Sequence, residues 1–127
     1  MLDLRTVLNL DAIASGVLGA GLIVLAGVLE DPLGLPVIVA VAVGAFLVVW
    51  AGFVAWAARR GSVTAVKEII AVNGAYAVTS VAFAVSGWVD LTGLGVAFVL
   101  LQAAVVAALA LLQVAGLRET RRDAAPV

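Results

Sequence analysis

Polar side chains stand at helical spacing within the long apolar runs of this 127-residue chain. Three of them lie five or six residues from a basic residue of the same run, in the pairs Asp11 with Arg5, Asn73 with Lys67, and Gln113 with Arg118. A helix rises about 1.5 Å per residue, so each polar group lies roughly 8 to 9 Å inward from a cation. We therefore expect these three side chains to share one layer.

The carboxyl group of Asp11 has two interpretations. It could be an ion or proton site with Asn73 and Gln113 as neutral ligands, because ionisable residues inside membranes usually face the bundle interior or a wet cavity. Alternatively, Asp11 caps its own helix or extends towards a cation such as Arg59, Arg60 or Lys67. We favour this second, structural interpretation.

Gln102 lies deeper, about 15 Å along a helix from Thr92. A lone amide at that depth needs a partner on another helix, and Ser80 or Thr79 is nearest in depth. The residues that we expect to form a polar interior are Asp11, Asn73, Tyr76, Ser80, Gln102 and Gln113. They could line a narrow pore or pocket, or they could hold the helices in register. We favour the second role, because no other ionisable group occurs at mid-depth.

The chain contains no cysteine and no histidine. This composition removes disulfides, thiol chemistry, imidazole or thiolate metal sites and His-ligated haem. It also contains no arrangement that pairs a nucleophile with a base. We therefore expect no catalytic, cofactor or metal site and a non-enzymatic protein.

The composition places the chain in a membrane. Of its residues, 65% are hydrophobic and 12% are charged, which is too apolar for a soluble domain of this size. Lipid leaves no water for unpaired backbone groups, so only helices or closed barrels can cross it. The apolar runs lack period-two alternation and are rich in alanine and leucine, which favours helices.

Turn and capping residues divide the chain into helices at about 6–29, 36–58, 64–88 and 92–117, followed by a disordered tail at 123–127. The first helix should end at Glu30-Asp31-Pro32, and it is a retained span rather than a signal peptide. Ser62 or Thr64 should cap the third helix, and Asp90 or Thr92 the fourth. The short loops predict an all-α, up-down four-helix bundle that forms a single transmembrane domain over residues 1–127.

The charged residues predict the orientation of the chain. All seven basic residues fall near the termini or in the middle loop, namely Arg5, Arg59, Arg60, Lys67, Arg118, Arg121 and Arg122. The other two loops carry only Glu30, Asp31 and Asp90. The positive-inside rule therefore places both termini in the cytoplasm, and we expect a multi-pass protein of the cell membrane.

A shift of 62 residues superposes Arg5 on Lys67, Asp11 on Asn73, and the Arg59-Arg60 pair on Arg121-Arg122. A tandem duplication of one helical hairpin would produce this repeat, with a pseudo-twofold axis along the membrane normal. Chance similarity within an alphabet dominated by alanine, valine, leucine and glycine would produce it as well. Both explanations stay open.

Small residues recur four apart throughout the chain, as in Ser15 with Gly19, Ala40 with Gly44, and Ala103 with Ala107. Such spacing lets helix backbones approach closely in lipid. We therefore predict an interaction or accessory subunit that contacts the lipid bilayer, a partner membrane protein or a second copy, and no nucleic acid. The alternative is a small homo-oligomeric transporter or channel that uses Asp11, Asn73, Ser80, Gln102 and Gln113.

Several local patterns look familiar together: Leu10-Asp11-Ala12 with Ser15-Gly16, Gly34-Leu35-Pro36, Arg59-Arg60, Asn73 with Tyr76 and Ser80, Gly87-Trp88, and the run from Gln102 to Arg118. The chain resembles small four-helix integral membrane proteins of GC-rich bacteria, and the resemblance covers nearly its whole length. It departs from them at Tyr76, where a tryptophan is expected. The resemblance implies a bacterial inner-membrane protein with the same fold and brings no activity with it.

Overall fold

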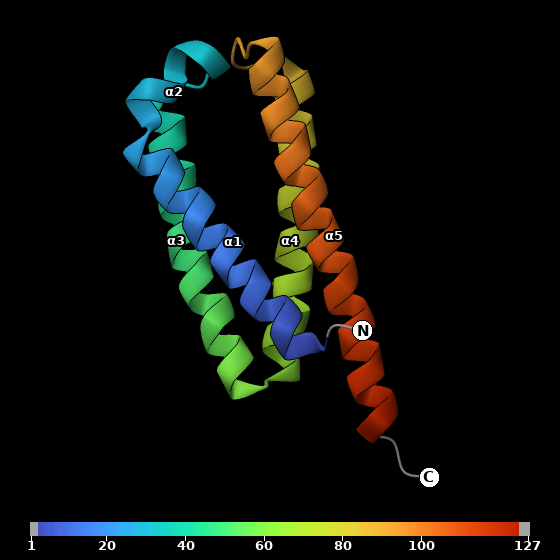
Figure 1. Ribbon diagram of the computed structural model, residues 1–127. Coiled ribbons are helices and arrows are strands. Elements are labelled where there is room, and N and C mark those ends of the chain that lie inside the picture. The colour runs from blue at the N-terminus through green and yellow to red at the C-terminus, as the bar shows by residue number, and fades with distance from the viewer. Residues whose placement is uncertain (1–2, 125–127) are drawn as a thin grey trace.

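The computed structural model describes the backbone of residues 3–124 and the side chains of residues 3–120, and this part of the chain is all-helical (Figure 1). Its helices are α1 (Leu4–Val24), α2 (Ala26–Leu33), α3 (Val37–Arg60), α4 (Val63–Ser86) and α5 (Gly93–Ala124). Four of them, all except α2, are long and apolar enough to cross a membrane. The expected all-helical fold with four candidate spans is therefore confirmed.

The first apolar segment is not one continuous helix. The chain turns at Leu25, whose N–H still donates to the Gly21 carbonyl at 2.9 Å, and then continues as α2. Instead of ending at residues 30–32, the helical chain passes through Pro32 to Leu33. It ends at Gly34, where φ is 68° and the N–H donates to the Glu30 carbonyl at 2.8 Å. Glycine adopts this left-handed conformation without steric strain.

Side-chain caps fix where three of the spans begin. Asp3 accepts a hydrogen bond from the Thr6 N–H at 2.8 Å, and Ser62 accepts one from the Ala65 N–H at 3.2 Å. Thr92 caps α5 by accepting from the Gly95 N–H at 3.0 Å. Of the alternatives that the sequence left open, the structure selects Ser62 and Thr92. At the C-terminal side, α5 includes residues 123 and 124 of the expected tail, and residues 125–127 lie outside the described part.

The spans pack as two antiparallel pairs, α1 with α3 and α4 with α5 (Figure 1). The pairs meet mainly where α1 and α2 contact α5, whereas α3 and α4 contact each other only slightly. The α1–α3 contact is close because of Gly19 and Gly44: a Cβ atom at Gly19 would lie 2.7 Å from the Gly44 carbonyl oxygen. The fold is therefore two helical hairpins in partial contact.

The two hairpins are joined at both ends. We call the end that holds the α3–α4 loop the basic end and the other the acidic end, after their charged residues. At the basic end all four spans contribute to one buried cluster, the basic-end core: Leu8, Val54, Ala57, Ala58, Ala65, Val66, Ile69 and Leu117. At the acidic end Thr92 donates its hydroxyl to the Pro32 carbonyl at 2.6 Å and its N–H to the Leu33 carbonyl at 3.0 Å.

Replacing Thr92 with valine should weaken the joint at the acidic end. The substitution keeps the shape but removes both the cap of α5 and the bond to the Pro32 carbonyl. Loss of a helix cap typically costs about 0.5 to 2 kcal/mol, and we expect about 1 to 2 kcal/mol here. The change can be measured by SDS unfolding of the protein in detergent micelles. Thr64→Val is the control, since Thr64 is exposed; an equal effect of both would remove Thr92 as a joint.

Candidate functional site

Three buried polar side chains from three spans form a ring of hydrogen bonds near the basic end, which we call the polar triad. The amide nitrogen of Asn73 donates to Asp11 Oδ2 at 2.8 Å and to Gln113 Oε1 at 3.0 Å. The amide nitrogen of Gln113 donates to the same Asp11 oxygen at 2.6 Å. All three side chains are almost fully buried, with exposures of 0 to 4%. The triad therefore joins α1, α4 and α5 through direct contacts.

The sequence places each member of the triad one helical turn from a residue of the basic-end core. Leu8 precedes Asp11 on α1, Ile69 precedes Asn73 on α4, and Leu117 follows Gln113 on α5. Because residues three or four apart share a helix face, each polar group points in the same direction as its buried neighbour. The apolar core thus holds the three polar groups against one another.

A fourth residue, Ser15, completes the hydrogen bonds of the carboxyl group. Its hydroxyl donates to Asp11 Oδ1 at 3.1 Å from one turn further along α1. Ser15 was not predicted as a polar partner, although the spacing of four residues between Asp11 and Ser15 was a usable signal. With this contact, both carboxyl oxygens of Asp11 accept hydrogen bonds.

The favoured structural interpretation of Asp11 was wrong. Asp3, not Asp11, caps the first helix, and the Asp11 side chain points inward to amides instead of outward to a cation. The physical reason is rotational: Asp11 shares a face with the buried residues Val7 and Leu8, so packing of that face carries the carboxyl group inside. The three residues that were expected to share one layer, Asp11, Asn73 and Gln113, are hydrogen-bonded to one another.

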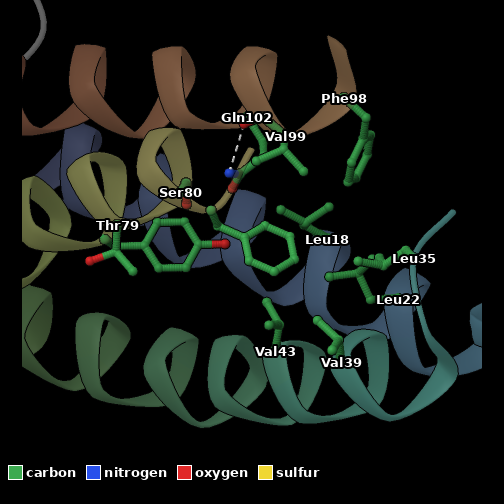
Figure 2. Close-up of a pocket in the computed structure, with 12 residues that line it drawn as sticks. Leu18, Leu22, Leu35, Val39, Val43, Thr79, Ser80, Phe98, Val99 and Gln102 are labelled. Atoms are coloured by element: carbon green, nitrogen blue, oxygen red, sulfur yellow. Dashed lines mark hydrogen bonds between the residues drawn. The ribbon is translucent and has the colours of Figure 1, made fainter. Parts of the chain in front are cut away.

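The remaining candidates, Tyr76, Ser80 and Gln102, lie between the hairpins and take no part in the hydrogen bonds of the triad. They line a cavity of about 190 Å³ whose other walls come from α1, α3 and α5 (Figure 2). The Tyr76 ring stacks against the Phe46 ring of α3, with ring centroids 6.3 Å apart. The six expected residues therefore form two groups, the triad and this cavity.

The expected pairing of Gln102 with Ser80 or Thr79 was wrong. The Gln102 amide nitrogen donates to the Val99 carbonyl of its own helix at 2.9 Å, and its Oε1 atom is buried without a partner (Figure 2). Depth alone could not predict this contact, because a glutamine side chain can also fold back onto the helix that carries it. Thr79 and Ser80 nevertheless line the same cavity.

A second cavity, of about 240 Å³, connects the two groups of residues. It is lined by Asp11 and Ser15 at one end, and it shares Leu18, Tyr76, Phe98 and Gln102 with the first cavity. The two spaces therefore adjoin, and we call them together the central cavity. The cavity can form hydrogen bonds, because its apolar wall carries hydroxyl and amide groups. It also holds one carboxyl group, whose oxygens are already hydrogen-bonded.

No protein-family model, no curated protein sequence and no solved structure matches this chain. The resemblance to small four-helix membrane proteins therefore stays a prediction from the sequence.

Proposed function

We propose that this chain is a non-enzymatic membrane protein that acts as an interaction or accessory subunit. Its partner would be another membrane-spanning helix, either of a different protein or of a second copy. The observation that carries this proposal is an apolar groove on α4 and α5, on the faces turned away from the central cavity. The groove measures about 530 Å³ and is lined by Ala77, Val78, Val81, Ala82, Leu100, Ala103, Ala104 and Ala107.

The groove suits a helix because its floor is made of small side chains. Ala77 and Ala103 are buried at the bottom, and Val78 and Val81 stand exposed along one side. In lipid there is no hydrophobic drive between helices, so association depends on close packing, which small residues permit. The polar side chains of the spans lie elsewhere, which leaves this surface free of groups that would have to be desolvated.

Cysteine cross-linking tests the proposal directly, because the chain has no cysteine of its own. Ala104→Cys places one thiol in the groove, and Val49→Cys places one on α3, where the side chain is 75% exposed. In native membranes treated with a bis-maleimide, we expect a cross-linked product at Ala104→Cys and little at Val49→Cys. Equal products at both positions would contradict the groove as an interface, and no product at either would contradict a second copy as its occupant.

A substitution that fills the groove should disrupt the same association. Ala104 is exposed, so Ala104→Leu should fill the groove and leave the hairpins intact. The cross-link can be followed with Ala82→Cys in the same protein. Ala104→Leu should lower the yield of this cross-link at least about tenfold, which corresponds to about 1.4 kcal/mol of binding free energy. Blue-native electrophoresis gives an independent measure of the same complex. Val49→Leu is the matched control and should leave the complex unchanged.

The orientation proposed for the chain is with both termini in the cytoplasm of the cell membrane. The basic side chains described at the basic end are Arg5, Arg59, Arg60, Lys67 and Arg118, whereas Glu30, Asp31 and Asp90 lie at the other end. The positive-inside rule supports this assignment. Reporter fusions after Asp31 and after Arg60 should report the outside and the cytoplasm, respectively. The reverse result would overturn the orientation.

A tandem duplication of a hairpin receives one further piece of support. Asp11 and Asn73 superpose in the 62-residue repeat, and they also hydrogen-bond to each other. Equivalent residues meet in this way when they lie next to a twofold axis. The break at Leu25 and helix α2 have no equivalent in the second hairpin, so the two halves would have diverged at the acidic end.

A small transporter is the alternative function, and the central cavity beside Asp11 is the observation that favours it. Proton flux into liposomes, followed with an internal pH-sensitive dye, separates the two functions. The interaction proposal expects no flux above that of empty liposomes. Flux that disappears with Asp11→Asn or Gln102→Leu, in protein that remains folded, would replace the interaction subunit with the transporter.

A further inference from the structure

The central cavity holds an acceptor that the protein leaves unpaired. Gln102 Oε1 is buried and receives no hydrogen bond, while its amide nitrogen is used by the Val99 carbonyl. A buried acceptor without a partner is unfavourable, because burial removes its hydrogen bonds to water. Figure 2 shows Gln102 in the wall of the cavity formed between the two hairpins. A ligand that brings a hydrogen-bond donor to this atom would remove the penalty.

The shape of the cavity indicates an apolar body for such a ligand. Most of its walls are aliphatic or aromatic, with Leu18 and Leu22 from α1, Val39 and Val43 from α3, and Phe98 from α5. Apolar cavities of about 150 Å³ in proteins stay dry and bind hydrocarbons such as benzene. The two adjoining spaces of about 190 and 240 Å³ exceed that size.

The charges around the cavity indicate a neutral ligand. Among the side chains that the structure describes, none of those lining the part of the cavity that holds Thr79 and Ser80 is charged. Asp11 lies at the far end of the second part, where Ser15, Asn73 and Gln113 already donate to its oxygens. An ammonium or carboxylate group would therefore enter without a free counter-ion, and burying an unpaired charge is strongly unfavourable.

Access to the cavity comes from the bilayer. The basic-end core and the polar triad close one end, and the contact of Thr92 with Pro32 and Leu33 closes the other. Between these ends the second part of the cavity is lined by Leu101 and Val105 of α5, whose side chains are exposed, so this side opens towards lipid. A molecule that is dissolved in the membrane can reach this side of the cavity without crossing water.

We propose that the central cavity binds a neutral lipid alcohol, with its hydroxyl group donating to Gln102 Oε1 and its hydrocarbon chain lying between the hairpins. Tyr76, Thr79 and Ser80 line the same space, and their hydroxyl groups are further hydrogen-bonding groups of the site. This binding site is separate from the groove on α4 and α5, so it does not depend on the interaction proposal.

Photolabelling of the full chain in phosphatidylcholine nanodiscs tests the site. The probe is a diazirine derivative of 1-decanol, and its methyl ether, which cannot donate a hydrogen bond, is the comparison. We expect the alcohol to label peptides around Leu18 and Phe98, with about tenfold higher apparent affinity than the ether. Excess 1-decanol should remove the labelling.

Two variants separate recognition of the hydroxyl from occupancy of the cavity. Gln102→Leu replaces the amide with an apolar side chain of similar size, so both probes should still label the variant but with equal affinity. Val43→Phe fills the cavity and should reduce labelling by both probes at least about tenfold, whereas Val49→Phe, on the exposed face of the same helix, should not. Helix content by circular dichroism and the unfolding midpoint verify that each variant is folded.

Several outcomes would overturn the proposal. Labelling outside the cavity would remove the site, and equal affinity of wild-type protein for the alcohol and the ether would remove the role of the hydroxyl. A preference for the alcohol that survives in Gln102→Leu would show that a group other than Gln102 recognises the hydroxyl. Because the comparison of the two probes in Gln102→Leu needs no other variant, it decides the matter even where Val43→Phe does not fold.

Discussion

Asp11→Ala is expected to lower the stability of the protein by about 2 to 4 kcal/mol, because it leaves buried amide donors without their acceptor. Asn73 and Gln113 both donate to Asp11 Oδ2, at 2.8 and 2.6 Å, within an almost fully buried layer. The loss should appear in SDS unfolding from detergent micelles. It should also weaken contact between the hairpins, seen as faster proteolysis of the α3–α4 loop.

Asn9→Ala is the matched control for this experiment. Asn9 lies two residues earlier on α1, is polar and is exposed, so its substitution should change stability by less than about 0.5 kcal/mol. Asp11→Ala combined with Gln113→Leu should cost less than the sum of the two single changes, because the residues contact each other. Unchanged or higher stability of Asp11→Ala would mean that burial of the carboxyl group outweighs its hydrogen bonds.

Gly19→Val should be strongly destabilising at the contact of α1 with α3. A Cβ atom at this position would lie 2.7 Å from the Gly44 carbonyl oxygen and 2.9 Å from Leu47 Cβ. Backbone atoms cannot rotate away as a side chain can, so the two helices would have to separate. Overpacking of this kind costs about 1 to 3 kcal/mol, and valine should reach about 3 kcal/mol or more. SDS unfolding measures the change.

Gly21→Val is the control on the same helix. Gly21 has nothing within 4 Å of its Cβ position, so valine there meets open space, which in a membrane is lipid. We expect its stability to equal that of the natural protein within about 1 kcal/mol, since glycine is itself a weak helix former. A similar loss for both substitutions would mean that the close approach of Gly19 to Gly44 does not hold the hairpin together.

The four apolar spans could be predicted from the sequence because they follow from strong local signals. Long apolar runs require helices in lipid, and Gly34, Gly61 and Ser62 mark turns and caps through their own conformational preferences. The break at Leu25 had no such signal. It follows a run of apolar residues without proline, and it arises where α2 packs against α3 and α5.

The polar groups were predictable in depth but not in direction. The rise of a helix placed Asp11, Asn73 and Gln113 at one level, and the structure brings these side chains together. Direction depends on how each helix is rotated and on which helices are neighbours. Gln102 illustrates this limit: its depth was known, but its bond to the Val99 carbonyl depends on a side-chain rotamer.

The polar triad also has a consequence for biosynthesis. Gln113 follows Asp11 by 102 residues and Asn73 follows it by 62, so the ribosome has to reach α5 before the ring can close. A polypeptide that stops before α5 therefore inserts with the carboxyl group of Asp11 missing one donor, and one that stops before α4 lacks both amides. Membrane proteases that recognise unpaired polar groups in the bilayer would therefore recognise the incomplete chains.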